Sequence, residues 1–453
     1  MGLRVLIVAE HASAAFGGEA ALPLHYYRVL RDRGTPVWLV VHMRTRAELD
    51  AMFPGDPNII YIEDSIWNPM LWRMTCMLPG RLAYFTTGFM MRLLTQMAQR
   101  RKVRQLVQQE QINVIHQPMP VSPKEPSMLY DLGAPVVIGP MNGGMNYPPA
   151  FRKMQSPLVD KTLALGRKAS GLMNTLMPGK KKAALLLVAN QRTRQALPQG
   201  VCQNVVEMVE NGVDLSVWES ADRVAKPDSA VTRYAFMGRL VHWKAVDLLL
   251  EAFTTAAAQA PITLTIIGDG EDRAALQQQA EALGILSDQP EQAGKIWFAG
   301  WRSQPDCSAL LEQADALVLP SLLECGGSVV LEAMTAGLPA IATNWGGPTD
   351  YLNDDCGILV EPTCHEGFIE GLSAAMVKLA QSPELRISMG QAAQQRAREH
   401  FDWEAKVDRM TVLYQQAIAT HILASQERGK RDRLDRTGWL NGLAIEQLKE
   451  NAL

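Results

Sequence analysis

Several features that define other protein classes are missing from this sequence of 453 residues. Its six cysteines form no Cys-x-x-Cys pair and lack the spacing of a zinc site, which indicates reduced thiols. No signal-peptide pattern is present at the N-terminus, and no apolar run reaches the roughly 18 residues of a transmembrane helix. No repeat or low-complexity segment occurs either. We therefore expect a globular cytoplasmic protein.

The composition and length indicate more than one folded domain. Hydrophobic residues make up 47% of the chain and charged residues 20%, enough apolar material for several cores. At the usual domain size the length predicts about two to three domains.

The net charge of -3 conceals an asymmetry between the two halves. Residues 1–200 hold 24 Lys and Arg against 12 Asp and Glu, a charge of +12, whereas residues 201–453 hold 20 against 35, a charge of -15. Such asymmetry favours two domains with different partners, the basic one meeting anionic lipid, phosphate or nucleic acid. No recognised nucleic-acid-binding module supports the last of these, and we expect no nucleic-acid partner.

Short β-branched runs alternate with longer helical patterns along the whole chain, which is typical of parallel sheets crossed by helices. The predicted strands are Arg4–Ala9, Val37–His42, Ile59–Ile62, Asn113–His116, Pro135–Gly139, Leu185–Ala189, Arg233–Met237, Thr263–Ile267, Lys295–Ala299, Ala316–Pro320, Ala340–Thr343 and Gly357–Val360. Two sets of about six strands predict two doubly wound α/β domains. We place them at residues 1–200 and 201–400, followed by a helix and a charged tail at 401–453.

Two basic segments of the first half are candidates for a surface contact. The segment Asn68–Gln109 interleaves Met, Trp, Phe and Leu with Lys and Arg and has no acidic residue, and Arg152–Lys182 is similarly basic. Apolar side chains with clustered cations suit a helix lying on an anionic membrane leaflet. An amphipathic core helix with a solvated basic face explains the same pattern, and both interpretations stay open.

The strongest candidate site is the stretch from Ser321 to Met334. Gly326, Gly327 and Ser328 follow a predicted apolar strand and open a predicted helix, where backbone N–H groups and the helix dipole favour a phosphate. Glu324 precedes the helix and Glu332 lies about two turns further on, so the two carboxylates can contact different parts of one ligand.

Two further stretches follow predicted strands. Arg239 and Lys244 place two cations where a diphosphate binds at the carboxyl end of a parallel sheet. Gly17 and Gly18 open the first helix and allow close approach of a phosphate or of an acceptor from the other domain. The full Gly-x-Gly-x-x-Gly spacing is missing, which argues against a nicotinamide-dependent dehydrogenase.

Other patterns are less specific. The Gly-rich turns at 140–144 and 345–350 either line the cleft between the domains or simply turn the chain. The apolar spacing from Phe401 to Tyr414 predicts an amphipathic helix, and the role of the tail from His421 onward is not defined by its sequence.

Taken together, these residues resemble the retaining glycosyltransferases of the GT-B fold, family 4. The resemblance rests on Gly238-Arg239-Leu240 with Lys244, on Pro320-Ser321 leading to Glu324 and Glu332, on Glu332-Ala333-Met334 and on Gly337-Leu338-Pro339. The motifs Gly268-Asp269-Gly270, Phe298-Ala299-Gly300 and Asn211-Gly212-Val213-Asp214 extend it. It covers residues 188–413 well and the N-terminal half more loosely, through Gly17-Gly18 and the strand ending at His116.

The resemblance implies a fold and a set of roles. Two Rossmann-like domains would face each other across a cleft, and the last helix would cross back to the first domain. Arg239 and Lys244 would neutralise the diphosphate of a nucleotide sugar, Glu332 would bind the ribose, and Glu324 would hold the donor sugar. The backbone of Gly326, Gly327 and Ser328 would contact sugar or phosphate, and Gly17 and Gly18 would close over the phosphates. His116 would lie near the reacting centre, and neither a metal ion nor a cofactor would be needed.

Two departures from the family pattern concern the donor pocket and the histidine. The family more often has an aromatic residue at the position of Gly326, and its histidine strand often carries an additional His. A structural or positioning role for His116 therefore stands beside a catalytic one.

The predicted function is retaining transfer of a sugar from a nucleotide sugar to a glycan or lipid-linked acceptor, in surface polysaccharide or glycolipid assembly. A peripheral contact with the inner face of the membrane would follow from the basic half. The alternatives are a nucleotide-sugar epimerase of the same fold and a non-catalytic nucleotide-sugar-binding scaffold.

Overall fold

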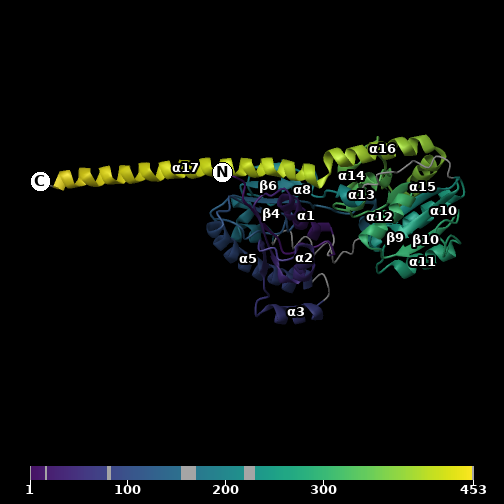
Figure 1. Ribbon diagram of the computed structural model, residues 1–453, viewed down its shortest axis with the longest axis horizontal. Coiled ribbons are helices and arrows are strands. Elements are labelled where there is room, and N and C mark those ends of the chain that lie inside the picture. Colours follow the sequence, from purple (N-terminus) through teal and green to yellow (C-terminus); the bar gives the residue numbers. More distant parts are fainter. Residues whose placement is uncertain (1, 16–17, 79–82, 155–169, 219–229, 451–453) are drawn as a thin grey trace.

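The computed structural model describes residues 2–15, 18–78, 83–154, 170–218 and 230–450. It shows two α/β domains side by side, with one long helix running along the first of them and beyond it (Figure 1). Each domain is built on a parallel sheet with helices on both faces, as the alternation of short apolar runs and helical patterns predicts.

The first sheet has the strand order β3-β2-β1-β4-β5-β6-β7, and all of its strand pairs are parallel. Its strands are β1 (Val5–Val8), β2 (Val37–His42), β3 (Ile59–Ile62), β4 (Val114–Gln117), β5 (Val136–Met141), β6 (Leu185–Val188) and β7 (Val205–Glu207). The central strands are continuous runs of Val, Ile and Leu because both of their faces are buried.

Helices cover both faces of this sheet. The elements that join the strands are α1 (Gly18–Asp32), η1 (Met43–Thr45), α2 (Arg46–Met52), α3 (Asn68–Met77), η2 (Tyr84–Gly88), α5 (Phe89–Gln109), η3 (Pro149–Met154), α7 (Gly179–Lys182) and α8 (Gln191–Ala196). The short helix α9 (Leu215–Trp218) follows β7 and packs on the second domain, since Trp218 is buried in its core. One core lies between the sheet and α1, and a second contains Val103, Leu106 and Val107 of α5.

The second sheet has the order β10-β9-β8-β11-β12-β13, again entirely parallel. Its strands are β8 (Thr232–Met237), β9 (Ile262–Ile267), β10 (Ile296–Gly300), β11 (Ala316–Leu319), β12 (Ala340–Thr343) and β13 (Gly357–Val360). Its helices are η4 (His242–Lys244), α10 (Val246–Ala257), α11 (Arg273–Ala282), α12 (Gln304–Gln313), α13 (Ser328–Thr335), α14 (Pro348–Tyr351), α15 (His365–Gln381) and α16 (Pro383–His400). In both sheets the strand order reverses beside the first strand of the domain, because β1 lies between β2 and β4, and β8 lies between β9 and β11. Ligands of such sheets bind at that point.

The last helix, α17 (Trp403–Glu450), returns to the first domain. Val407, Met410 and Tyr414 of α17 are buried in the same core as α1. The link between the domains is fixed to the start of this helix, since the Val213 N–H donates to the Phe401 carbonyl at 2.8 Å. A side chain at Gly212 would place its Cβ 2.9 Å from the Trp403 ring, so this contact requires glycine.

The twelve predicted strands all form, with small differences at their ends. The prediction missed β7, a three-residue strand that pairs with β6 and continues the first sheet beyond residue 200. Among the described helices, none has the length and apolar character needed to cross a membrane.

Candidate functional site

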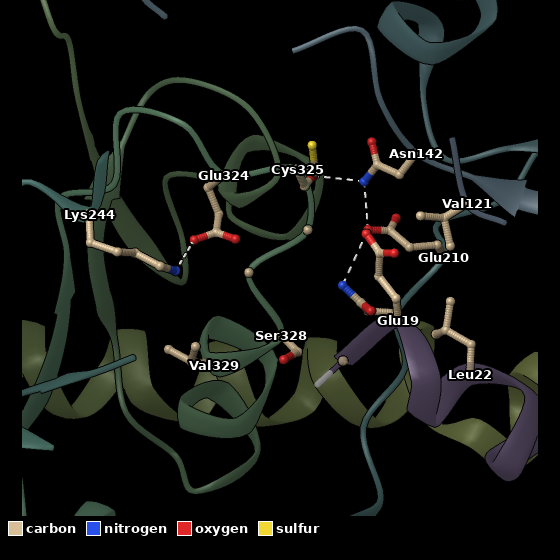
Figure 2. A pocket seen from close by; sticks show the side chains of 14 residues that line it. Glu19, Leu22, Val121, Asn142, Glu210, Lys244, Glu324, Cys325, Ser328 and Val329 are labelled. Atoms are coloured by element: carbon tan, nitrogen blue, oxygen red, sulfur yellow. Dashed lines mark hydrogen bonds and ion pairs between the residues drawn. The ribbon is translucent and has the colours of Figure 1, made fainter. Parts of the chain in front are cut away.

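A cavity of about 240 Å³ lies between the two domains, at the carboxyl ends of their strands. Figure 2 shows the side chains around it. Its lining residues are Gly18, Glu19, Leu22, Val121, Asn142, Glu210, Asn211, Lys244, Glu324, Cys325, Gly326, Gly327, Ser328 and Val329. The cavity thus brings together Lys244, Glu324, Gly326, Gly327, Ser328 and Gly18, which the sequence singled out from both halves.

The loop from Glu324 to Ser328 forms one wall of the cavity and leads from β11 into α13. Gly327 is the N-cap of α13 and has φ +81°, a conformation that glycine adopts without strain. The N–H groups that begin α13 and the positive end of the helix dipole therefore lie beside the cavity.

A second Gly-rich turn supports this loop from behind. A Cβ at Gly346 would lie 2.3 Å from the Glu324 carbonyl oxygen, and one at Gly347 would lie 2.0 Å from the Gly326 carbonyl oxygen. The Gly347 N–H donates to the Glu324 carbonyl at 2.8 Å. The turn at 345–350 also faces the first domain, since Trp345 Nε1 donates to the Asn146 carbonyl at 2.8 Å and Asn190 Nδ2 donates to Asp350 Oδ2 at 2.7 Å. Its glycines support the site loop and are absent from the cavity lining.

Lys244 and Glu324 form an ion pair inside the cavity, with only 13% and 15% of their side chains exposed. The two are held in place by the backbone, since the Leu322 N–H donates to the Trp243 carbonyl at 2.9 Å. The cation and the carboxylate thus neutralise each other until an anionic ligand competes for Lys244.

Arg239 lies outside the cavity lining and is exposed. It makes no side-chain hydrogen bond or ion pair with the part of the chain that the structure describes. The neighbouring Gly238 faces Lys244, because a Cβ there would lie 3.8 Å from Lys244 Nζ. Arg239 therefore stands near the cavity as a cation without a fixed partner among these residues.

Glu332 also lies outside the cavity lining, one turn along α13 from Ser328. Burial raises the pKa of its carboxyl to about 7, and a hydrogen bond from Ser328 opposes that shift. A half-buried carboxyl of this kind is suited to accept hydroxyl hydrogen bonds rather than to face anionic phosphate.

The first domain contributes the start of α1 to the cavity. Gly18 faces the opposite domain, since a Cβ there would lie 3.9 Å from Ser328 Oγ. Gly17 lies outside the described residues. Glu19 and Leu22 line the cavity beside Gly18 and were not among the predicted site residues, although Glu19 directly follows the glycine pair.

His116 is buried in the core and does not line the cavity. Its Nε2–H donates to the Gly139 carbonyl at 2.7 Å, because a carbonyl oxygen can only accept. Its Nδ1 then accepts from the Tyr414 hydroxyl at 2.7 Å, and burial lowers the pKa of the ring to about 4. The expected place of His116 at the reacting centre is therefore corrected: it is a neutral histidine joining β4, β5 and α17.

A buried polar junction at the cavity wall was missed from the sequence. Asn142 Nδ2 donates to Glu210 Oε1 at 2.5 Å and to the Cys325 carbonyl at 2.7 Å, so it joins the first domain, the linker and the second domain. Asn211 Nδ2 also donates to Glu210 Oε1, at 3.2 Å. Asn142 belongs to the Gly-rich turn at 140–144, which therefore does line the cleft. No sequence signal pointed to Glu210.

The two basic segments are only partly surface features. Within Asn68–Gln109, Arg92 pairs with Glu125 at 2.7 Å and Arg100 donates to the Met128 and Tyr130 carbonyls. Within Arg152–Lys182, residues 155–169 lie outside the described residues, and Lys180 is buried with its Nζ on the Ser122 and Pro123 carbonyls.

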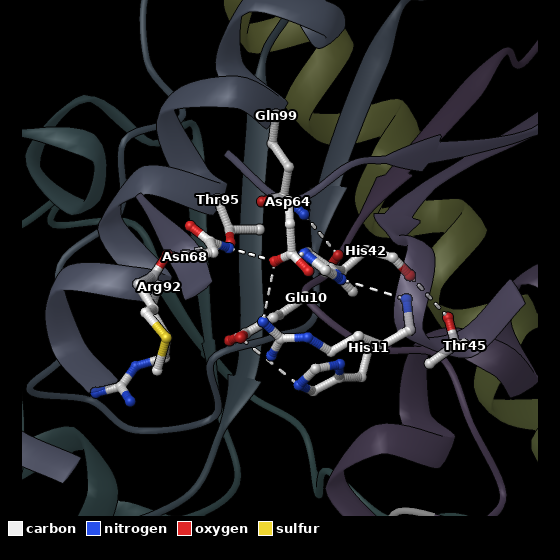
Figure 3. A network of polar contacts seen from close by, with 12 residues as sticks. Glu10, His11, His42, Thr45, Asp64, Asn68, Arg92, Thr95 and Gln99 are labelled. Atoms are coloured by element: carbon white, nitrogen blue, oxygen red, sulfur yellow. Dashed lines mark hydrogen bonds and ion pairs between the residues drawn. The ribbon is translucent and has the colours of Figure 1, made fainter. Parts of the chain in front are cut away.

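The helix α3 nevertheless presents an apolar face to solvent. Its exposed side chains, with those of the two residues before it, are Ile66, Trp67, Met70, Trp72, Met74 and Met77. Figure 3 shows the polar network at the start of α3, in which Asn68 donates to Asp64 and Asp64 contacts His42 Nε2 at 3.2 Å. Since His42 ends β2 and is buried, the network fixes α3 to the sheet.

Residues 221–396 match the family model described as glycosyl transferases group 1. This matched domain is similar to the glycosyl transferases of group 1. This domain contains Lys244, Glu324, Glu332 and the loop between β11 and α13, so the family resemblance stated from the sequence is confirmed.

Curated relatives of this chain align over part of it. Glycogen synthase of Mycobacterium tuberculosis is 31% identical over 201 residues, which cover 44% of this chain and 45% of that protein. D-inositol 3-phosphate glycosyltransferase of the same species is 29% identical over 255 residues, covering 54% and 51%. The chain thus spans about half the length of the curated relatives it matches.

Solved structures align with nearly the whole chain. A glycosyltransferase from Rickettsia africae has a TM-score of 0.62 at 14% identity and covers 92% of this chain and 99% of its own. Anabaena Alr3699/HepE in complex with UDP has a TM-score of 0.60 at 15% identity, covering 91% and 99%. These likenesses concern the fold, and they confirm the expected GT-B architecture.

Proposed function

We propose that this protein transfers a sugar from a nucleotide-sugar donor to a hydroxyl group of a glycan or lipid-linked acceptor. One observation carries the proposal. The cavity between the domains places a cation, a carboxylate and the N-terminus of α13 opposite the first turn of α1. An anionic donor and a neutral hydroxyl acceptor can meet there from opposite sides.

The second domain supplies the groups that would bind the donor. Lys244, with Arg239 at the cavity mouth, would neutralise the diphosphate, and the N–H groups of Gly327 and Ser328 would contact phosphate or sugar. Glu332 would accept from the ribose hydroxyls and Glu324 would hold the donor sugar. Positive charge from the two side chains and the helix dipole can replace a divalent metal ion, so we propose a transfer without metal or cofactor.

The proposed transfer retains the anomeric configuration. The acceptor oxygen bonds to the anomeric carbon on the face from which the donor phosphate departs. The bond between that carbon and the phosphate oxygen breaks, its electron pair leaves with the diphosphate, and the acceptor proton passes to the leaving phosphate oxygen. Lys244 stabilises the charge that grows on the diphosphate. Water exclusion between the domains strengthens this interaction.

Three of the similar proteins support this assignment by their names. Anabaena Alr3699/HepE has been described with UDP-glucose, and the Mycobacterium tuberculosis relatives are a glycogen synthase and an inositol phosphate glycosyltransferase. These point to a nucleotide sugar as donor and to a hydroxyl acceptor. Surface polysaccharide or glycolipid assembly is the process that we propose for the chain.

Thermal denaturation with UDP, GDP, ADP, CMP and their common sugars tests the donor site. We expect one nucleotide class to stabilise the protein, by about 2.7 kcal/mol at 100 times its dissociation constant. Lys244→Ala and Glu332→Ala should each remove most of that stabilisation. Failure of every nucleotide to bind would contradict the proposal. Conversion of the donor sugar without an acceptor would support an epimerase instead, and binding without turnover a scaffold.

For the acceptor side, we propose that the apolar face of α3 contacts an anionic phospholipid surface. The argument is chemical complementarity: two Trp and several Met side chains are exposed there, and no acidic residue occurs from Asn68 to Gln109. Trp side chains favour the interfacial layer of a bilayer, and nearby cations favour its anionic lipids. The network around Asp64 holds α3 firmly enough to present this face. A peripheral position on the inner leaflet would bring lipid-linked acceptors to the first domain.

Vesicle flotation with the full chain tests this contact. We expect binding to vesicles of phosphatidylglycerol and phosphatidylcholine, and weaker binding to phosphatidylcholine alone. The double variant Trp67→Ser/Trp72→Ser should lower the affinity by about tenfold or more, because burying one large apolar side chain contributes ~1.5–3 kcal/mol. Trp301→Ser in the second domain is the matched control, since Trp301 is 74% exposed. Absence of binding by the wild type, or an equal loss in the control, would refute the contact.

A further inference from the structure

Glu210 is a buried carboxyl at the wall of the cavity that none of the roles above uses. It lies in the link between β7 and α9, and only 5% of the residue is exposed. In Figure 2 its side chain lies beside Asn142, on the other side of the Cys325–Ser328 loop from the Lys244–Glu324 pair. A carboxyl in such a place requires hydrogen bonds to offset the loss of water.

The two oxygens of this carboxyl differ. Oε1 accepts from both Asn142 Nδ2 and Asn211 Nδ2, at 2.5 Å and 3.2 Å. Oε2 is buried and accepts no hydrogen bond from the residues that the structure describes. Burial raises the pKa of Glu210, while hydrogen bonds from Asn142 and from the backbone N–H of Glu210 itself, and the nearby Lys406 ammonium, oppose the shift. One oxygen is therefore committed to the junction between the domains, and the other is left without a partner.

Gly326 leaves the space into which these groups reach. A Cβ at this position would lie 2.6 Å from Glu210 Oε1 and 2.4 Å from Asn211 Nδ2. Gly326, Glu210 and Asn211 all line the cavity. The polar side chains of Glu210 and Asn211 therefore occupy the space that a side chain at position 326 would need.

We propose that Glu210, supported by Asn142 and Asn211, is a specificity-determining residue that binds a hydroxyl group of the donor sugar through Oε2. The inference rests on the proposed function. It adds the part of the donor that the site recognises, a sugar hydroxyl next to Gly326. A sugar hydroxyl can donate to Oε2 and so supply the hydrogen bond that this oxygen lacks. In the proposed function the nucleotide binds along Lys244 and α13, on the other side of the Cys325–Ser328 loop from Glu210.

The substitution Glu210→Gln separates this role from a structural one. The amide oxygen of Gln can accept from Asn142 and Asn211 as Oε1 does, whereas its NH₂ group replaces the acceptor Oε2 with a donor. We therefore expect the hydrogen bonds of the junction to persist, and any loss of melting temperature to come from the missing negative charge beside the buried Lys406 ammonium. Gly326→Ala is the second variant. Its Cβ would displace the Glu210 and Asn211 side chains while leaving both residues chemically unchanged.

The readout is the pair of dissociation constants for a nucleotide and its sugar, measured by calorimetry on the full chain. The pairs are UDP and UDP-glucose, GDP and GDP-mannose, ADP and ADP-glucose, and CMP and CMP-sialic acid. For the pair that binds, Glu210→Gln should weaken the nucleotide sugar by about tenfold or more, the range for a hydrogen bond to a charged group. The affinity for the free nucleotide should change by less than about twofold. Gly326→Ala should likewise weaken the nucleotide sugar more than the nucleotide.

Two results would overturn the inference while leaving the proposed function intact. Equal losses for nucleotide and nucleotide sugar would show that Glu210 only holds the junction together. Unchanged affinities for both would show that its free oxygen meets no ligand. A wild type that binds none of UDP, GDP, ADP, CMP and their sugars would instead contradict the proposed function, so the two failures are distinguishable.

Discussion

Replacing Lys244 with Ala is expected to lower kcat/KM for glycosyl transfer by about 10²- to 10³-fold, the range for removing one preorganised group that stabilises developing charge. Lys244 is the cation that lines the cavity, and it is paired with Glu324 inside it. Without it, no Lys or Arg side chain is left among the described residues that line the cavity. The Glu324 carboxylate would also face the anionic donor without compensation. Initial rates with the donor found by the thermal screen measure the effect.

The matched control is Lys378→Ala on α15, which removes an exposed lysine from the same domain. It should leave the rate within about twofold of the wild type. Glu324→Gln combined with Lys244→Ala should cost less than the sum of the single losses, because the pair acts as a unit. A Lys244→Ala enzyme that keeps more than about a third of the wild-type rate would contradict the assigned role.

Replacing Gly347 with Ala should damage the site without touching any group that contacts a ligand. The backbone of Gly347 is helical, with φ -61°, so alanine has no conformational obstacle there. The obstacle is steric, since the new Cβ would lie 2.0 Å from the Gly326 carbonyl oxygen and 2.5 Å from that of Cys325. The Glu324–Ser328 loop must therefore move. We expect destabilisation of about 1–3 kcal/mol and a loss of activity of roughly 100-fold, since displacements near 1 Å have such effects.

Thermal melting and initial rates on the same preparation check this expectation. Gly171→Ala is the control, because a Cβ at Gly171 would meet no atom within 4 Å. Alanine there should be neutral or stabilising by up to about 1 kcal/mol, as for an exposed helical position. If Gly347→Ala melts and turns over like the wild type, the close approach of the two loops does not shape the site.

Much of the fold and part of the site follow from local sequence patterns. Runs such as Val5–Val8 and Ala316–Leu319 are uniformly apolar because both faces of a central parallel strand are buried. Once strands and helices alternate, the strand ends carry the ligand-binding loops, which is why Lys244 and Glu324 could be assigned before any contact was known. The glycines between β11 and α13 belong to the same local rule, since Gly327 needs a positive φ to begin the helix.

Other expectations depended on packing between distant segments and could not be read locally. His116 was a candidate for the reacting centre, but the hydroxyl of Tyr414, 298 positions away, donates a hydrogen bond to its Nδ1 in the core. Lys180 looked like a surface cation in a basic run, but it lies buried on the carbonyls of Ser122 and Pro123. The three residues of β7 carry too short an apolar pattern to predict a strand, and only the edge of β6 makes them one.

By itself, therefore, the sequence determined two doubly wound domains and the loops at their strand ends, because strand and helix patterns depend on residues a few positions apart. The tertiary structure decided which side chains meet across the cleft. Asn142 lies 68 positions from Glu210 and 183 from Cys325, and only domain packing joins the three. The hydrogen bonds and the pKa of a buried carboxyl depend on the groups that surround it in space. For Glu210 those groups come from both domains and the link between them.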